Sequence, residues 1–136
     1  MANTKPIGVA YSDQDISGAD TLYAQGEIGY NLAAQTAVTQ ATSKSTAVTA
    51  NTSAGQITTN NAALAATTTV TFTLNNSRLS SKDTLIVTVA SGGTAGAYNA
   101  WVSGLAAGSA TIALRNITAG PLSEAVVLNF AIIHGE

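Results

Sequence analysis

Oxygen-bearing side chains recur through residues 13–20, whose sequence is DQDISGAD. Oxygen ligands at alternate positions followed by a glycine are typical of the first half of a calcium-binding loop. The twelfth position of such a loop is Ala24, where a bidentate carboxylate is needed, and no helix is predicted on either side. We therefore interpret the segment as an acidic turn whose side chains bind their own backbone, and we expect no metal site there.

The chain contains one histidine, His134, and no cysteine. A Ser–His–Asp site would have to use His134, which is third from the end of the sequence. Chain ends are usually mobile, whereas catalytic groups must be held rigidly. We expect an exposed tail residue and no catalytic role. A hydrolase is the alternative that an ordered His134 beside an acidic group would favour. No zinc site is expected without further His or Cys ligands.

Two further patterns resemble functional motifs. The segment Ser91–Gly96 is rich in glycine, but no Lys-Ser or Lys-Thr pair follows it and no helix begins there, so it predicts a hairpin loop rather than a phosphate-binding loop. Glycosylation triplets begin at Asn51, Asn75 and Asn116. The amino-terminal residues lack the apolar core of a signal peptide, so we attach no function to these triplets.

Aromatic side chains are the remaining candidates for recognition. Trp101 and Tyr98 would form a sugar-stacking platform if they were exposed, and core or interface packing is the alternative. Tyr11, Tyr23 and Tyr30 all fall in the first 35 residues. Tyrosine is enriched at protein interfaces because it buries a large area at low entropic cost, so these three residues and Trp101 are the candidate partner contacts. The alternative for the three tyrosines is an arm that folds back on its own sandwich. We predict no catalytic residues and no bound cofactor.

From about residue 37 onward, apolar side chains alternate with Thr, Ser and Ala, which indicates β-strands with one face buried. Strong alternation marks the segments around residues 70–74, 85–89, 111–115 and 126–132. Weaker strands are predicted at 38–41, 46–50, 55–59 and 97–103. Gly, Asn and Ser clusters separate these segments, as expected for turns.

The first 35 residues differ from the rest, because four glycines interrupt them and four of the seven acidic residues lie there. We predict an extended arm over 1–35 with short strand pieces at 7–11, 21–24 and 27–31. Residues 32–36 are the one segment that resembles a short helix, but the segment is too brief for a helix to be predicted there. Residues 36–136 form the second domain. About eight short strands with frequent turns predict an all-β fold, a jelly-roll-like antiparallel β-sandwich.

Charged residues make up only 9% of the chain, against about 25% in typical soluble domains. Between Ile28 and Ser77 the single charged residue is Lys44. Five basic residues and a net charge of −2 provide no basic patch for nucleic acid. No segment has the roughly 18 apolar residues of a membrane span. The composition favours a β-protein whose surface is largely covered by protein partners, or one that persists outside a cell.

Stretches throughout the chain resemble small structural proteins of tailed bacteriophages, and most closely capsid cement or decoration proteins. They are residues 6–10, 17–21, 27–30, 38–46, 91–98, 107–109, 114–116 and 122–130.

The resemblance implies a jelly-roll sandwich on the outside of the virion, assembled in the host cytoplasm. Its implied partners are the major capsid protein and further copies of itself, as a homodimer or homotrimer. It implies no active site. The alternative is a head- or tail-fibre module that recognises a glycan on the host surface.

Overall fold

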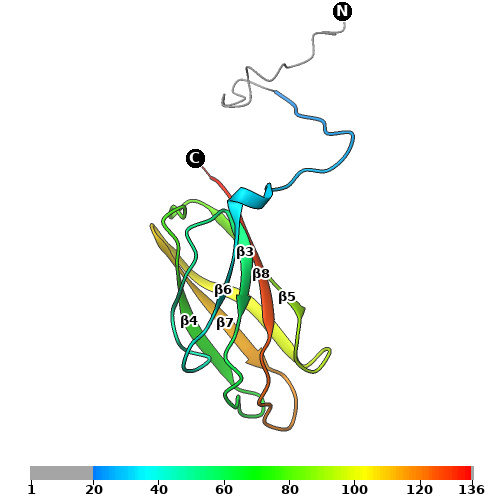
Figure 1. Cartoon of the computed structure of the whole chain (residues 1–136), viewed down its shortest axis with the longest axis vertical. Coiled ribbons are helices and arrows are strands. Elements are labelled where there is room, and N and C mark those ends of the chain that lie inside the picture. Colours follow the sequence, from blue (N-terminus) through cyan, green and yellow to red (C-terminus); the bar gives the residue numbers. More distant parts are fainter. Residues whose placement is uncertain (1–19, 136) are drawn as a thin grey trace, which may run out of the picture.

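The protein is a sandwich of two four-stranded β-sheets, and the computed structural model describes residues 20–135 (Figure 1). One sheet, here called sheet A, has the order β1-β3-β8-β5, and the other, sheet B, has the order β2-β4-β7-β6. The strands are β1 (Gln35–Thr39), β2 (Val48–Thr49), β3 (Ala54–Thr58), β4 (Thr69–Asn75), β5 (Thr84–Ser91), β6 (Tyr98–Ala106), β7 (Ser109–Asn116) and β8 (Val127–Ile133). The predicted eight-stranded β-sandwich is confirmed, and each of the eight predicted strands overlaps an observed one.

The strand directions depart from the prediction of purely antiparallel pairing. Strands β1 and β3 are parallel, as are β2 and β4, whereas the other four pairs are antiparallel. The reason is the path of the chain, which alternates between the two sheets from β1 to β5. Two reversals separate β1 from β3, so these neighbours run in the same direction.

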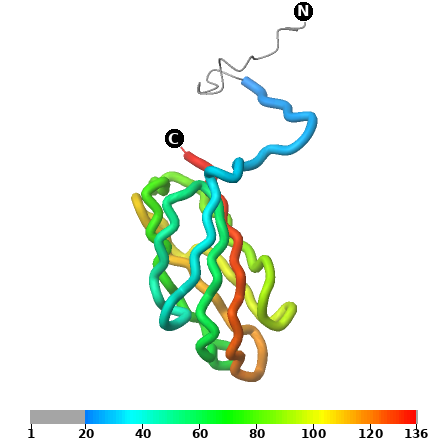
Figure 2. Tube along the Cα trace, viewed as in Figure 1, coloured from blue at the N-terminus to red at the C-terminus, as the bar shows by residue number. Residues whose placement is uncertain are grey.

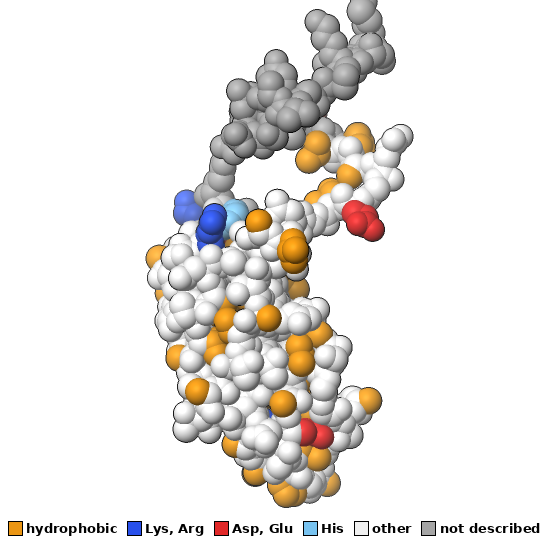
Figure 3. Space-filling model, viewed as in Figure 1, with side chains coloured by type: hydrophobic (Ala, Val, Ile, Leu, Met, Phe, Trp, Pro, Cys, Tyr) orange, Lys and Arg blue, Asp and Glu red, His pale blue; other side chains and the backbone are white. Residues whose placement is uncertain are grey.

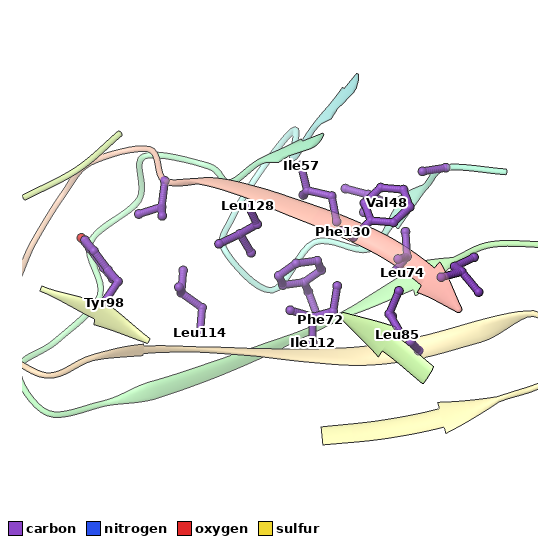
Figure 4. Packing of buried hydrophobic residues seen from close by; sticks show 14 of the residues in the cluster. Val48, Ile57, Phe72, Leu74, Leu85, Tyr98, Ile112, Leu114, Leu128 and Phe130 are labelled. Atoms are coloured by element: carbon purple, nitrogen blue, oxygen red, sulfur yellow. The ribbon is translucent and has the colours of Figure 1, made fainter. Parts of the chain in front are cut away.

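The core is made of the inward-facing side chains of both sheets, as the alternation predicted. Figure 4 shows Phe72 of β4 and Phe130 of β8 pointing into the space between the sheets, among aliphatic side chains. The fully buried aliphatic residues include Ile57, Leu74, Ile112, Leu114, Leu128 and Ile132. Burying one such side chain contributes about 1.5–3 kcal/mol, so this layer holds the two sheets together.

The arm and the carboxyl end of the chain leave the sandwich at the same end (Figures 1 and 2). The segment 32–36, which is too brief for a helix prediction, contains one 3-10 turn, η2 (Leu32–Ala34). The strand pieces predicted at 21–24 and 27–31 are wrong, because the described arm forms no strand. A strand needs a hydrogen-bonded neighbour, and this part of the arm extends away from both sheets. The piece predicted at 7–11 lies outside the described residues.

Candidate interaction surfaces

The base of the arm is fixed to the outer side of sheet A. The hydroxyl of Tyr30 donates a hydrogen bond to the backbone carbonyl of Ile132 in β8. The Nε2 of Gln35 donates to the carbonyl of Tyr30 at 2.8 Å, and Asn31 caps the following turn by accepting from the backbone N–H of Ala34 at 3.1 Å. These bonds hold residues 30–35 against the sheet and fix where the rest of the arm begins.

Beyond this base the arm carries large apolar side chains that the described chain leaves uncovered. Leu22 is 67% exposed, Tyr23 is 89% exposed and Ile28 is 80% exposed. Single exposed apolar residues are common on proteins, but three within one short segment form a patch. Each of these side chains would contribute about 1.5–3 kcal/mol on full burial, so their burial against a partner would stabilise a complex.

A hollow of about 660 Å³ lies between the arm base and the outer face of sheet A. Its walls come from the arm and from all four strands of the sheet. The lining includes Tyr30, Leu32, Gln35, Ala37, Ala54, Gln56, Ile86, Thr88, Asn129 and Ala131. None of these side chains is charged. We call this feature the sheet A hollow.

An amide pair lies on this face, where Gln56 of β3 is in register with Asn129 of β8. The Nε2 of Gln56 donates to Oδ1 of Asn129 at 3.0 Å. Within residues 20–135 the two side chains make no other hydrogen bond, so Oε1 of Gln56 is left as an acceptor and Nδ2 of Asn129 as a donor. A ligand that offers both a donor and an acceptor, such as a peptide group, matches this pair.

Charge is nearly absent from the strands and lies mainly in the connections at the two ends of the sandwich. Arg115 is the only charged residue in the eight strands. Arg78 and Lys82 lie in the β4–β5 connection, and the backbone of Lys82 packs against Gly135, which follows His134. Figure 3 shows basic side chains close to the histidine at the end of the sandwich from which the arm leaves. The described arm carries the opposite sign, through Asp20 and Glu27. The described arm is therefore acidic, whereas the end of the sandwich beneath it exposes two basic side chains and buries one acidic side chain, that of Asp83.

The outer face of sheet B presents threonines and one aromatic residue. Thr69 and Thr71 of β4 are exposed, as the alternation predicted. Trp101 is 41% exposed, whereas its neighbour in register, Ala113, is 1% exposed. Tyr98 faces the opposite way and is buried. The two aromatic rings therefore do not form a shared platform, and Trp101 is available on the surface of this chain.

His134 is ordered beside an acid rather than lying free as a tail. Its Nδ1 is 3.2 Å from Oδ2 of Asp83, whose side chain also accepts from the backbone N–H of Gly135 at 3.1 Å. Asp83 further accepts from the Ser80 backbone N–H at 2.8 Å and from the Ser80 hydroxyl at 2.9 Å. The backbone hydrogen bond from Ser80, more than any other contact, lowers the pKa of Asp83 to about 2. Ser80 and His134 thus share one carboxylate, whereas a catalytic triad needs a Ser–His bond.

The opposite end of the sandwich encloses Lys44, which is 3% exposed. Its Nζ donates to the backbone carbonyls of Asn60 and Glu124. Burial lowers the pKa of Lys44, and the Glu124 charge partly offsets this effect. Lys44, the single charged residue between Ile28 and Ser77, therefore joins two loops inside the protein. The surface formed by residues 28–77 carries no charge.

The glycine-rich segment 91–96 connects β5 of sheet A to β6 of sheet B, so the predicted hairpin is wrong and the loop is a crossover. It is anchored by Glu124, whose Oε1 accepts from the backbone N–H of Thr94 at 2.5 Å. This bond is the main cause that lowers the pKa of Glu124.

The neighbouring Tyr98 hydroxyl makes no hydrogen bond within residues 20–135. Burial, followed by the effect of Glu124, raises the pKa of Tyr98 to about 12.

The sequence-predicted contact residues fall on different parts of the molecule. Tyr23 and Tyr30 lie on the arm, Trp101 lies on the outer face of sheet B, and Tyr11 is outside the described residues. The structure brings only Tyr30 to the sheet A hollow. The amide pair of Gln56 and Asn129 was missed, because the two residues are 73 positions apart and only strand register joins them.

The chain matches no protein-family model, no curated protein and no solved structure. Residues 20–135 contain no cluster of three or more metal-ligating His, Cys, Asp or Glu side chains. Of the predicted acidic turn only Asp20 is described, and it is exposed. No helix in the described chain is long and apolar enough to span a membrane.

Proposed function

We propose that this protein is a bacteriophage capsid cement protein, a non-enzymatic protein that binds the outside of the major capsid protein shell and stabilises the head. The exposed apolar arm beside an uncharged sheet face is the observation that carries the proposal. The sheet A hollow offers contact area without charges that must be desolvated, and the arm offers three exposed apolar side chains next to its two acidic residues, Asp20 and Glu27. The sequence resemblance described above supplies the capsid as the partner.

The mechanism would be the addition of buried area across the seams between capsid subunits. Each buried Å² of apolar surface contributes about 25 cal/mol, and every copy of the cement protein would add its own contacts to the shell. An oligomer that binds at several points would gain further from its high effective concentration at the second site. The result would be a head that resists the pressure of packaged DNA.

A direct test begins with the copy number of the protein in purified virions, measured by mass spectrometry. A cement protein should be present in numbers close to those of the capsid subunits, whereas a tail or fibre protein should be present in few copies. Heads stripped of the protein should rupture at a lower temperature, and adding back the full chain should restore the original temperature. Absence from the head, or an unchanged rupture temperature, would refute the proposal.

The arm can be tested in the same assay. Removing residues 1–28 should abolish binding to stripped heads while leaving the Tyr30 anchor and the sandwich intact, which circular dichroism checks. A Thr71→Ala chain, changed on the outer face of sheet B, serves as the control and should bind normally. Equal decoration by the truncated chain would exclude the arm as the capsid contact.

A second candidate function is recognition of a host glycan, which the exposed ring of Trp101 favours. Aromatic rings stack against sugar rings, and a half-exposed Trp on a β-sheet face is suitable for this contact. A glycan array with the full chain distinguishes the two candidates, because a cement protein should bind none of the sugars. If sugars are bound, Trp101→Ala should remove the binding.

A further inference from the structure

We propose that the protein self-associates by exchanging arms, with the arm of one copy lying across the outer face of sheet A of a second copy. Leu22 and Tyr23 of the incoming arm would occupy the sheet A hollow. The proposal rests on the described residues alone, and it holds whether or not the protein serves in a capsid.

The first argument is that the arm and the hollow each lack a partner among residues 20–135 of one chain. Beyond Tyr30 the arm extends away from the sandwich (Figure 2), and Leu22 and Tyr23 are among its most exposed residues. The arm base forms only one wall of the hollow, which remains open on the sheet face. An apolar segment and a hollow with mainly neutral walls on the same molecule are complementary when two copies meet.

The second argument is the reach of the arm. Fully extended, residues 20–28 span about 30 Å, at roughly 3.3 Å per residue. Strand β8 (Val127–Ile133), which runs through the middle of sheet A, is about 23 Å long by the same reasoning. One arm is therefore long enough to cross the full outer face of a neighbouring sheet.

The third argument is the chemistry of the hollow. The Gln56–Asn129 pair presents one acceptor and one donor outward, and an extended peptide backbone offers the matching N–H and C=O groups. The small side chains of Ala54 and Ala131, which lie opposite each other in register, allow a backbone to approach the sheet closely. No charged side chain lines the hollow, so an apolar arm displaces no strongly hydrated group.

The fourth argument is charge complementarity between the arm and its docking end. Asp20 and Glu27 on the arm are acidic, whereas the exposed Arg78 and Lys82 of the β4–β5 connection are basic. The one acidic residue of that connection, Asp83, is buried and bonded to Ser80 and His134. In an exchanged pair the acidic arm of each copy would lie near the basic end of the other. A two-fold arrangement repeats the same contact twice and closes, which limits the assembly to a defined size.

The absence of cysteine from the chain makes cross-linking specific. Two single-cysteine chains with different tags, Tyr23→Cys and Thr88→Cys, would be purified separately in full length, mixed and oxidised. We expect a disulfide-linked heterodimer, because Thr88 lines the hollow. The matched control replaces Thr88→Cys by Thr71→Cys, which places the cysteine on the outer face of sheet B. This control should cross-link at least tenfold less.

Light scattering gives a second readout that does not depend on cysteine. The unmodified full chain should have the mass of a dimer or a larger closed oligomer, and Ala131→Glu should weaken its association by about tenfold or more. Thr71→Glu, on sheet B, should leave the association unchanged.

The proposal would be overturned by a monomeric mass at all concentrations or by equal cross-linking to both sheets. It would also be overturned if a chain carrying both Tyr23→Cys and Thr88→Cys formed the disulfide within one molecule. Arm-dependent binding of a monomer to stripped heads would also overturn it, and would show that the arm contacts the capsid instead of a second copy. That result would leave the cement function standing, so the two proposals fail separately.

Discussion

The hydroxyl of Tyr30 donates a hydrogen bond to the carbonyl of Ile132, a residue 102 positions further along the chain. This bond joins the base of the arm to the last strand, β8. It divides the described arm into a fixed part next to the sheet and an extended part that begins before Tyr30. The position of this division determines which residues of the arm are available to a partner.

Tyr30→Phe should release the arm base. Loss of one hydrogen bond of this kind costs about 0.5–1.5 kcal/mol, so the change should act locally and leave the sandwich folded. Hydrogen exchange should become faster in residues 30–35 and remain slow in β8. Tyr23→Phe is the control, because Tyr23 is 89% exposed, and it should change neither rate. Equal exchange in both variants would mean that the hydroxyl does not anchor the arm.

Gly55→Ala should detach strand β1 from sheet A. A Cβ atom at Gly55 would lie 2.3 Å from the backbone carbonyl oxygen of Thr36 and 2.9 Å from the Phe130 ring. Such contacts force the edge strand to move, and we expect a loss of about 1–3 kcal/mol in the free energy of unfolding, measured by urea denaturation.

Gly104→Ala is the matched control, since its nearest neighbours, atoms of the Thr111 side chain, would be 3.6 Å or more away. We expect this change to cost about 0.5 kcal/mol or less. If the two alanine variants unfold at the same urea concentration, the close approach of β1 at Gly55 is not important for stability.

Asn116→Asp should destabilise the fold strongly, although it changes the side chain by a single group. The Nδ2 of Asn116 is fully buried and donates to the carbonyls of Leu64 and Gly120 at 3.0 and 2.8 Å. Replacing this donor with an oxygen places a carboxylate acceptor next to two carbonyl acceptors. We expect this change to lower the free energy of unfolding by about 3 kcal/mol or more. Asn99→Asp, on an exposed position of β6, should cost little by comparison. Thermal unfolding of the two variants measures the difference.

Stability should fall in acid because of Asp83. Its pKa drops from an ordinary value of 3.8 to about 2 in the folded chain, chiefly through the Ser80 backbone hydrogen bond. A carboxyl group with a lower pKa in the folded state than in the unfolded state stabilises the fold above its unfolded pKa. This contribution is therefore lost as the pH falls from about 4 to about 2.

Asp83→Asn should reduce stability at neutral pH and flatten its decline in that acid range. Urea denaturation at several pH values measures both effects. The Lys82→Gln chain, changed at the adjacent exposed position, should keep the original acid dependence. A variant Asp83→Asn chain with the same acid dependence as the unmodified chain would assign the effect to other carboxyl groups.

The sequence was sufficient to predict which residue types are candidate contacts, but not where these residues lie in the fold. The arm tyrosines and Trp101 were identified by their rarity in a chain with few aromatics. Their separation onto the arm and onto sheet B depends on which sheet each strand joins. His134 was expected to be an exposed tail residue because it lies near the end of the chain. It is exposed, but Asp83, 51 positions away, holds its ring in place.

The sequence by itself determined the strands and their buried faces, because the period of two between apolar residues is a local property. Alternation such as Val70, Phe72 and Leu74 against Thr69, Thr71 and Thr73 was sufficient to place these residues correctly. Only the tertiary structure decided the order and direction of the strands, since these follow from the path of the chain between sheets. For the same reason it alone brought Gln56 to Asn129 and Tyr30 to Ile132, where the hollow forms.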